Sequence, residues 1–234
     1  MFNPNPPHAV RSPIMYQSWS NISFLHWQYD GDVLQSRIPD GLFIDKFQGA
    51  AWISLTPFLL EHLRMPLMPP LPWLSRFPEM NLRTYVNGPA GPGIWFFSLD
   101  ADRLPAVVGA RFSFGLPYHW ADMQVVADGN RMHYYASRGG RARTNIEVET
   151  GPPFGNPDEL ATFLVARFRL YSMHRGRLIS VPVEHKRWPL HHARILNMEQ
   201  TVTDAARLHV HDQRLQVHFS PGVHVRVGPA LKHR

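Results

Sequence analysis

Turn sequences set the strongest limits on what this chain can fold into. The segment Asn87-Gly-Pro-Ala-Gly-Pro-Gly93 has a short apolar run on either side, and so does Asp128-Gly-Asn130. Glycine, asparagine and aspartate favour the tight turns that join neighbouring antiparallel strands. The chain is therefore predicted to form at least two β-hairpins, which favours an antiparallel sheet over a helical bundle.

Further alternating or continuous apolar runs predict the other strands, because such runs fit a pleated surface that is buried on one or both faces. The predicted strands cover residues 19–27, 50–56, 82–86, 94–99, 106–114, 123–127, 132–137, 143–149, 176–184, 207–211, 215–219 and 223–227.

Helix signals are fewer. Residues 32–38 form a short helical pattern that Pro39 ends. Asn156 is predicted to be an N-cap, with Pro157 at the first helical position and Glu159 at the third. One clear helix among many hairpins predicts an α+β protein that is mainly antiparallel β. We expect a curved or closed sheet with a few peripheral helices.

The proline-rich segment 65–78 excludes regular structure at that point of the chain. Long loops of this kind are often lids or binding loops. A proline-rich wrap over the surface is an equally good interpretation, so both stay open.

Length and composition bound the class of protein. With 234 residues and no linker or repeat, the chain is predicted to be one domain over residues 1–234, with residues 1–14 as a loosely ordered N-terminal arm. The lack of cysteine excludes disulfide and thiolate chemistry and fits a reducing, cytoplasmic location. We expect no membrane span and no signal peptide, because no apolar run is suited to either.

The net charge of +6 would permit nucleic-acid binding, but the basic residues are scattered along the chain. The one tight cluster, Arg138, Arg141 and Arg143, is interpreted as a solvated hairpin end, with an anion site as the alternative. We therefore expect no nucleic-acid partner.

The fourteen histidines invite a metal interpretation, but a catalytic metal site usually needs three convergent ligands. His209 and His211 fall on the polar side of a predicted strand, and His218 shares a face with Gln216. We therefore expect no metal and no cofactor. The chain also lacks the Gly-x-Ser-x-Gly and Gly-x-Gly-x-x-Gly signatures of serine hydrolases and dinucleotide-binding folds.

The stretch Glu79-Met-Asn-Leu-Arg-Thr-Tyr-Val86 most favours a functional site. On a strand, alternation places Asn81, Arg83 and Tyr85 on the face opposite to the residues between them. Two interpretations are open. In the first, Glu79 and Arg83 form an ion pair at the protein surface. In the second, they lie inside a cup-shaped sheet and form an anion clamp with an acid–base partner.

Four residues elsewhere are candidates for the same site. Arg111 lies within an apolar run, where a charge is costly unless it meets a partner in space. Tyr118 and His119 follow shortly and can supply hydrogen bonds or proton transfer. Trp188 is predicted as a pocket wall, with ordinary packing as the alternative.

Several motifs occur in order along the chain, within residues 24–27, 49–58, 77–86, 93–100, 109–118, 171–178 and 185–193. Together they make the chain resemble the bacterial DUF2071 (YqjF-like) family of uncharacterised proteins. That family is in turn similar, more distantly, to the acetoacetate decarboxylase superfamily. The resemblance implies a cone-like or barrel-like antiparallel sheet with an internal pocket.

The resemblance also implies a departure in chemistry. The Lys-Lys pair of the decarboxylases, whose first member forms a Schiff base with the keto acid, falls on Tyr118 and His119 here. Neither side chain can form that imine. Glu79 corresponds to the acidic residue of the decarboxylase pocket. The implied partner is a small oxygenated ligand, such as a carboxylate or keto compound, and self-association into a homo-oligomer is implied as well.

Three functions remain open on these grounds. In an enzyme, Arg83 or Arg111 holds a carboxylate, Glu79 moves a proton, and Tyr118 or His119 donates to a developing oxyanion. Such a set suits a lysine-independent isomerase, lyase or hydrolase. Alternatively the pocket belongs to a non-catalytic sensor or carrier of a small molecule. In the third hypothesis these residues are structural, and function lies at a protein interface.

Overall fold

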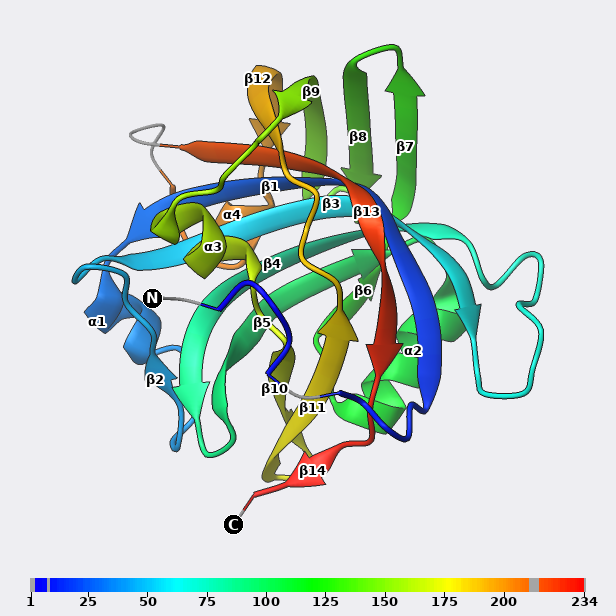
Figure 1. Ribbon diagram of the computed structural model, residues 1–234, viewed down its shortest axis with the longest axis vertical. Helices are drawn as coiled ribbons and strands as arrows, with labels where there is room; N and C mark the ends of the chain where they lie inside the picture. The colour runs from blue at the N-terminus through cyan, green and yellow to red at the C-terminus, as the bar shows by residue number, and fades with distance from the viewer. Residues whose placement is uncertain (1–2, 8, 211–214, 234) are drawn as a thin grey trace.

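Figure 1 shows the computed structural model, which describes residues 3–7, 9–210 and 215–233. Its strands are β1 (Met15–Tyr29), β2 (Phe43–Ile44), β3 (Ala51–Arg64), β4 (Phe77–Gly88), β5 (Gly91–Ala101), β6 (Tyr118–Trp120), β7 (Asp122–Asp128), β8 (Arg131–Ser137), β9 (Arg143–Pro153), β10 (Arg169–His174), β11 (Arg177–His185), β12 (His191–Gln200), β13 (Gln216–Val227) and β14 (Leu231–Lys232). Its helices are α1 (Gly31–Gln35), α2 (Leu104–Phe114), α3 (Glu159–Val165) and α4 (Val202–Ala205).

Seven strands close on themselves to form a ring. Their order is β11, β10, β5, β4, β3, β1 and β13, and β13 also pairs with β11. Within the ring every pair is antiparallel except β10 with β5. From β13 the sheet continues through β12, β9 and β8 to β7, which stand at the top of the view in Figure 1.

The ring strands separate two hydrophobic cores. Phe24 and Tyr85 belong to an inner core that also contains Trp188 and residues of α3. Leu25 and Leu82 belong to an outer core, where the ring packs against β8 and β9. Since neighbouring strand residues point to opposite faces, one β-strand supplies both cores. The same alternation decides which polar residues face the interior.

The predicted fold class is confirmed, because the structure is mainly antiparallel sheet with few helices. Both predicted hairpins are present, as β4–β5 and β7–β8. The two strands predicted over 215–219 and 223–227 form the single strand β13. The structure also contains β12, which the sequence patterns did not predict.

The strand predicted over residues 106–114 is wrong, because this segment is the helix α2. Pro105 lies in its first turn, and Gly115 ends it in the left-handed conformation. These residues are the ordinary start and stop signals of a helix. The apolar run itself does not distinguish a helix from a strand.

Two other predictions need correction. The helix α3 is capped by Asp158, not by Asn156, since the Asp158 carboxylate accepts a 2.7 Å hydrogen bond from the Ala161 amide. No strand forms over residues 207–210, and His211 lies outside the described residues.

Gly115 allows the chain to leave α2 and return along the ring. Its φ angle is 64°, and a Cβ atom there would meet the backbone carbonyl of Met173. We expect Gly115→Ala to lower the free energy of unfolding by about 2 kcal/mol, measured by urea denaturation. The matched control is Gly109→Ala within α2, where a Cβ atom meets nothing within 4 Å. That change should raise stability by about 0.5–1 kcal/mol. Equal stability of the two variants would contradict this account.

Candidate functional site

Strand β4 carries a row of four polar residues on the face that the ring encloses. Glu79, Asn81, Arg83 and Tyr85 alternate with Met80 and the other outer-core residues. Pairing with β3 is regular along the whole row, from Phe58 opposite Glu79 to Ser54 opposite Arg83. All four side chains are buried, with exposed fractions of 7% or less. The row therefore lies inside the protein and not on a solvent-exposed strand face.

Glu79 is paired with a tyrosine at one end of the row. The Tyr118 hydroxyl donates a 3.0 Å hydrogen bond to Glu79 Oε2. Burial raises the pKa of Glu79 to about 8, even though hydrogen bonds from Tyr118 and Asn81 pull that pKa down. Burial also raises the pKa of Tyr118, with the Glu79 charge acting in the same direction. At neutral pH both groups therefore hold their protons.

Arg83 is a buried cation that has no counter-ion among the residues that the structure describes. Among the described residues it forms no ion pair, and its buried Nε atom has no hydrogen-bond partner. Its guanidinium lies 5.8 Å from the centre of the Phe24 ring. Burial lowers the pKa of Arg83, and the neighbouring Tyr85 partly offsets this. A charge placed in this way is costly unless something else compensates it.

A second buried arginine differs from Arg83 in having a counter-ion. Arg167 lies 2.6 Å from the Asp45 carboxylate and also donates to the Phe163 carbonyl. Its guanidinium stacks over the Phe163 ring at 4.2 Å. Arg167 is therefore neutralised by Asp45, whereas the described part of the chain supplies no such partner for Arg83.

Tyr85 and His26 extend the polar row across the ring. The Tyr85 hydroxyl lies 2.9 Å from the Leu164 carbonyl and 3.0 Å from His26 Nδ1. Because a carbonyl only accepts, the hydroxyl donates to Leu164, and His26 Nδ1–H donates to the hydroxyl. Burial lowers the pKa of His26 well below its usual value, so the ring is neutral. His26 Nε2 is then a buried acceptor, and it has no hydrogen-bond partner among the described residues.

Aromatic side chains surround this row. Trp188 stacks on Trp19 with ring centres 6.1 Å apart and meets Phe24 edge-on at 5.1 Å. His185 lies 4.9 Å from Trp188, and burial lowers the pKa of His185 to about 4. Trp188 is thus anchored in the same inner core as Tyr85, and its indole N–H donates to the Val165 carbonyl.

The structure does not bring His119 and Arg111 to the row. Tyr118 and His119 are consecutive strand residues and point to opposite faces. Burial lowers the pKa of His119 to about 4, and the cations Arg138, Arg111 and Arg141 act in the same direction. Arg111 is an exposed residue of α2 whose Nε donates to the Tyr118 carbonyl.

Sequence reasoning missed His26, His185 and the Asp45–Arg167 pair. A histidine within the apolar stretch 24–27 was a usable signal for His26. No local signal points to the Asp45–Arg167 pair, because 122 residues separate its members.

The three lysines, Lys46, Lys186 and Lys232, are all exposed. Within the described residues no group of three or more histidine or acidic side chains is arranged to hold a metal ion. None of the helices in the described part of the chain is both long enough and apolar enough to cross a membrane.

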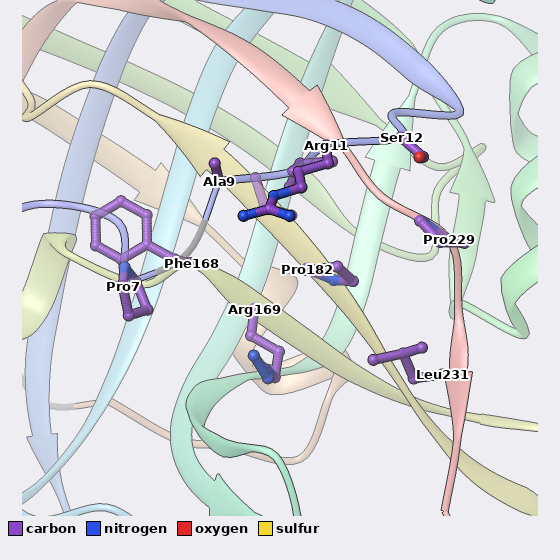
Figure 2. Close-up of a pocket in the computed structure, with 11 residues that line it drawn as sticks. Pro7, Ala9, Arg11, Ser12, Phe168, Arg169, Pro182, Pro229 and Leu231 are labelled. Atoms are coloured by element: carbon purple, nitrogen blue, oxygen red, sulfur yellow. The ribbon is translucent and has the colours of Figure 1, made fainter.

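A cavity of about 320 Å³ lies outside the ring, between the N-terminal arm and strands β10 and β11. Figure 2 shows Arg11 from the arm and Arg169 from β10 among mainly apolar residues. None of the residues predicted for the site lines this cavity.

Comparisons with known proteins agree with this architecture. The sequence model of the DUF2071 family, an uncharacterized conserved protein, matches residues 16–224 of this chain. Uncharacterized protein YqjF of Bacillus subtilis (strain 168) is 37% identical over 223 residues, covering 94% of this chain and 92% of that protein.

Solved structures share the fold at low sequence identity. The enduracididine biosynthesis enzyme MppR in complex with pyruvate is 13% identical, with a TM-score of 0.68 over 97% of this chain and 93% of its own. An acetoacetate decarboxylase-like enzyme from Sphingomonas wittichii RW1 is 12% identical, with a TM-score of 0.66 over 97% and 96%. Acetoacetate decarboxylase from Legionella pneumophila is 13% identical, with a TM-score of 0.60 over 99% and 90%.

Proposed function

Because this chain belongs to the DUF2071 family and has an acetoacetate decarboxylase-like fold, we propose that it binds a small carboxylate inside the strand ring and transfers a proton to or from it without lysine chemistry. The observation that carries the proposal is Arg83, a buried guanidinium with no ion pair among the described residues. A ligand carboxylate would supply the missing negative charge and accept hydrogen bonds from the guanidinium.

The spacing along β4 sets the size of the ligand. Glu79 and Arg83 are four residues apart on one strand, so their Cα atoms are separated by about 13 Å. In this proposal a short acid extends along β4 between the Arg83 guanidinium and the Glu79 carboxyl group. Asn81 lies midway, and its buried Oδ1 atom has no hydrogen-bond partner in the part of the chain that the structure describes. A short keto or hydroxy acid would place its second oxygen near Asn81 and Glu79.

The state of Glu79 favours proton transfer over binding alone. A carboxyl group with a pKa of about 8 holds a proton at neutral pH and can release it within a catalytic cycle. Tyr118 would donate a hydrogen bond to an oxygen that develops negative charge. These roles suit an isomerisation, dehydration or hydrolysis. A sensor or carrier would need Arg83 to bind the carboxylate, but it would not need a glutamate that holds its proton at neutral pH.

A thermal-shift screen tests the binding step. Millimolar short keto and hydroxy acids should raise the melting temperature, because a ligand that binds only the folded state stabilises it. The matched amides, which carry no charge, should have no effect. Equal shifts from acids and amides would contradict the role of Arg83.

Borohydride trapping tests the absence of lysine chemistry. All three lysines are exposed, and the family resemblance implies that Tyr118 and His119 stand where decarboxylases have their lysine pair. Treatment with acetoacetate and borohydride should therefore leave the protein mass unchanged. A reduced adduct on a lysine would overturn this part of the proposal.

A further inference from the structure

The loop between β3 and β4 and the helix α2 expose large apolar side chains. We call these residues the apolar face: Met65, Leu67, Met68, Leu71 and Trp73 of the loop, and Leu104, Val108 and Phe112 of α2. Their exposed fractions run from 45% at Leu71 to 102% at Leu67. Side chains of this type are normally covered.

The two segments form one continuous surface. Leu104, Val108 and Phe112 follow each other at intervals of four residues, which places them on one side of the helix. Arg103, next to the start of α2, donates a 2.9 Å hydrogen bond to the Trp73 carbonyl at the end of the loop. Figure 1 shows the loop and α2 at the same side of the molecule.

The apolar face is larger than a monomer normally leaves open. With roughly 150–250 Å² for each large side chain, its eight residues expose on the order of 900 Å². The largest apolar patch of a typical monomer is about 300–600 Å². A standard interface buries about 800 Å² on each partner, which is close to this area.

The composition of the face is that of a protein interface. Residues 64–76 and 103–114 contain no aspartate, glutamate or lysine, and arginine is the only charged residue type in them. Interfaces are enriched in aromatic residues, methionine and arginine, and depleted in lysine and acidic residues. Arg76 is paired with Glu61, and Arg103 with Asp102. Arg64 lies over the Tyr16 ring, and Arg111 donates to the Tyr118 carbonyl. Two of the four arginines in these segments are therefore neutralised by ion pairs within the chain.

The conformation of the loop also points to a partner. Leu67 has a φ angle of 64° and is fully exposed. A leucine in the left-handed region costs about 1–2 kcal/mol, and none of the described residues compensates this cost by burying the side chain. Four prolines, at positions 66, 69, 70 and 72, reduce the freedom that the loop would lose on binding.

We propose that a second copy of this chain docks on the apolar face and forms a two-fold symmetric dimer. A symmetric contact brings the same patch from both copies together, so one surface of this area and composition is sufficient. The loop of one copy would lie against α2 of the other. The proposal is independent of the ligand bound inside the ring.

Sedimentation velocity across the micromolar range tests the proposal. The unmodified chain should be a dimer that dissociates on dilution. Phe112→Glu should raise the dimer dissociation constant at least about thirtyfold, because a charge placed in an apolar contact is costly. The matched control is Phe43→Glu on β2, since Phe43 is 67% exposed and Phe112 is 72% exposed. The control should dimerise as the unmodified chain does.

A second variant shows whether a loss of dimerisation could be due to misfolding of Phe112→Glu. Leu67→Asn removes a fully exposed apolar side chain and places a residue that tolerates the left-handed conformation. It should fold as well as the unmodified chain and dimerise more weakly. A monomer at every concentration, or a dimer that both variants leave intact, would overturn the proposal. Sedimentation with phosphatidylglycerol vesicles by a protein that stays monomeric would also overturn it and would assign the face to a membrane surface.

Discussion

Replacing Arg83 by methionine should leave the protein at least as stable as the unmodified chain while lowering its affinity for short carboxylates about a hundredfold. The loss in affinity corresponds to about 2.7 kcal/mol, within the range of hydrogen bonds to a charged group. The gain in stability has a separate cause. Methionine fills much of the same volume without the cost of burying an unpaired charge. A residue that lowers the free energy of unfolding but raises the affinity for a ligand has a functional role and not a structural one.

Arg167→Met is the matched control for this prediction. It also removes a buried guanidinium, but it leaves the Asp45 carboxylate without its partner at 2.6 Å. Breaking a buried ion pair in this way should cost about 3–5 kcal/mol. Urea denaturation and isothermal titration with the acid found in the thermal-shift screen separate the two effects. If Arg83→Met loses as much stability as Arg167→Met, Arg83 is a structural residue and the proposed anion site is wrong.

The polar row of β4 could be predicted from sequence because it depends on one local rule. Alternation along a strand fixes that Asn81, Arg83 and Tyr85 share a face, and the structure places all three inside the ring. Alternation along the strand does not predict whether that face is exposed to solvent or enclosed by other strands. Enclosure depends on the pairing of β13 with β11, which joins residues far apart in the chain.

The errors have a similar origin. The segment that forms α2 is mainly apolar, with Arg111 and Ser113 as its polar residues, so the helix signals at Pro105 and Gly115 are the better guide to its structure. The prediction that Arg111 belongs to the site depends on its lying in a buried strand. On α2 it is exposed, and the reason for assigning it to the site no longer applies.

Glu79→Gln should be more stable than the unmodified chain at pH 8 by about 4 kcal/mol and equally stable near pH 4.5. The pKa of Glu79 is raised from 4.5 to about 8 in the folded protein. Below pH 4.5 the carboxyl group is protonated in both states and has no effect on folding. Between pH 4.5 and 8 only the unfolded chain releases the proton, so stability falls by about 1.4 kcal/mol for each pH unit. Glutamine cannot ionise, and it still accepts the Tyr118 hydrogen bond.

The measurement is the difference in free energy of unfolding between the two proteins, followed from pH 4.5 to 9. The buried histidines His26 and His185 have lowered pKa values and destabilise both proteins equally as the pH falls below 6.5, so their effect cancels in this difference. Glu199→Gln, on the exposed side of β12, controls for the loss of a surface carboxylate and should stay within about 0.5 kcal/mol. A difference that does not grow with pH would show that Glu79 is ionised when the protein folds. The proton proposed for catalysis would then be absent at neutral pH, and the site would be left with a binding role only.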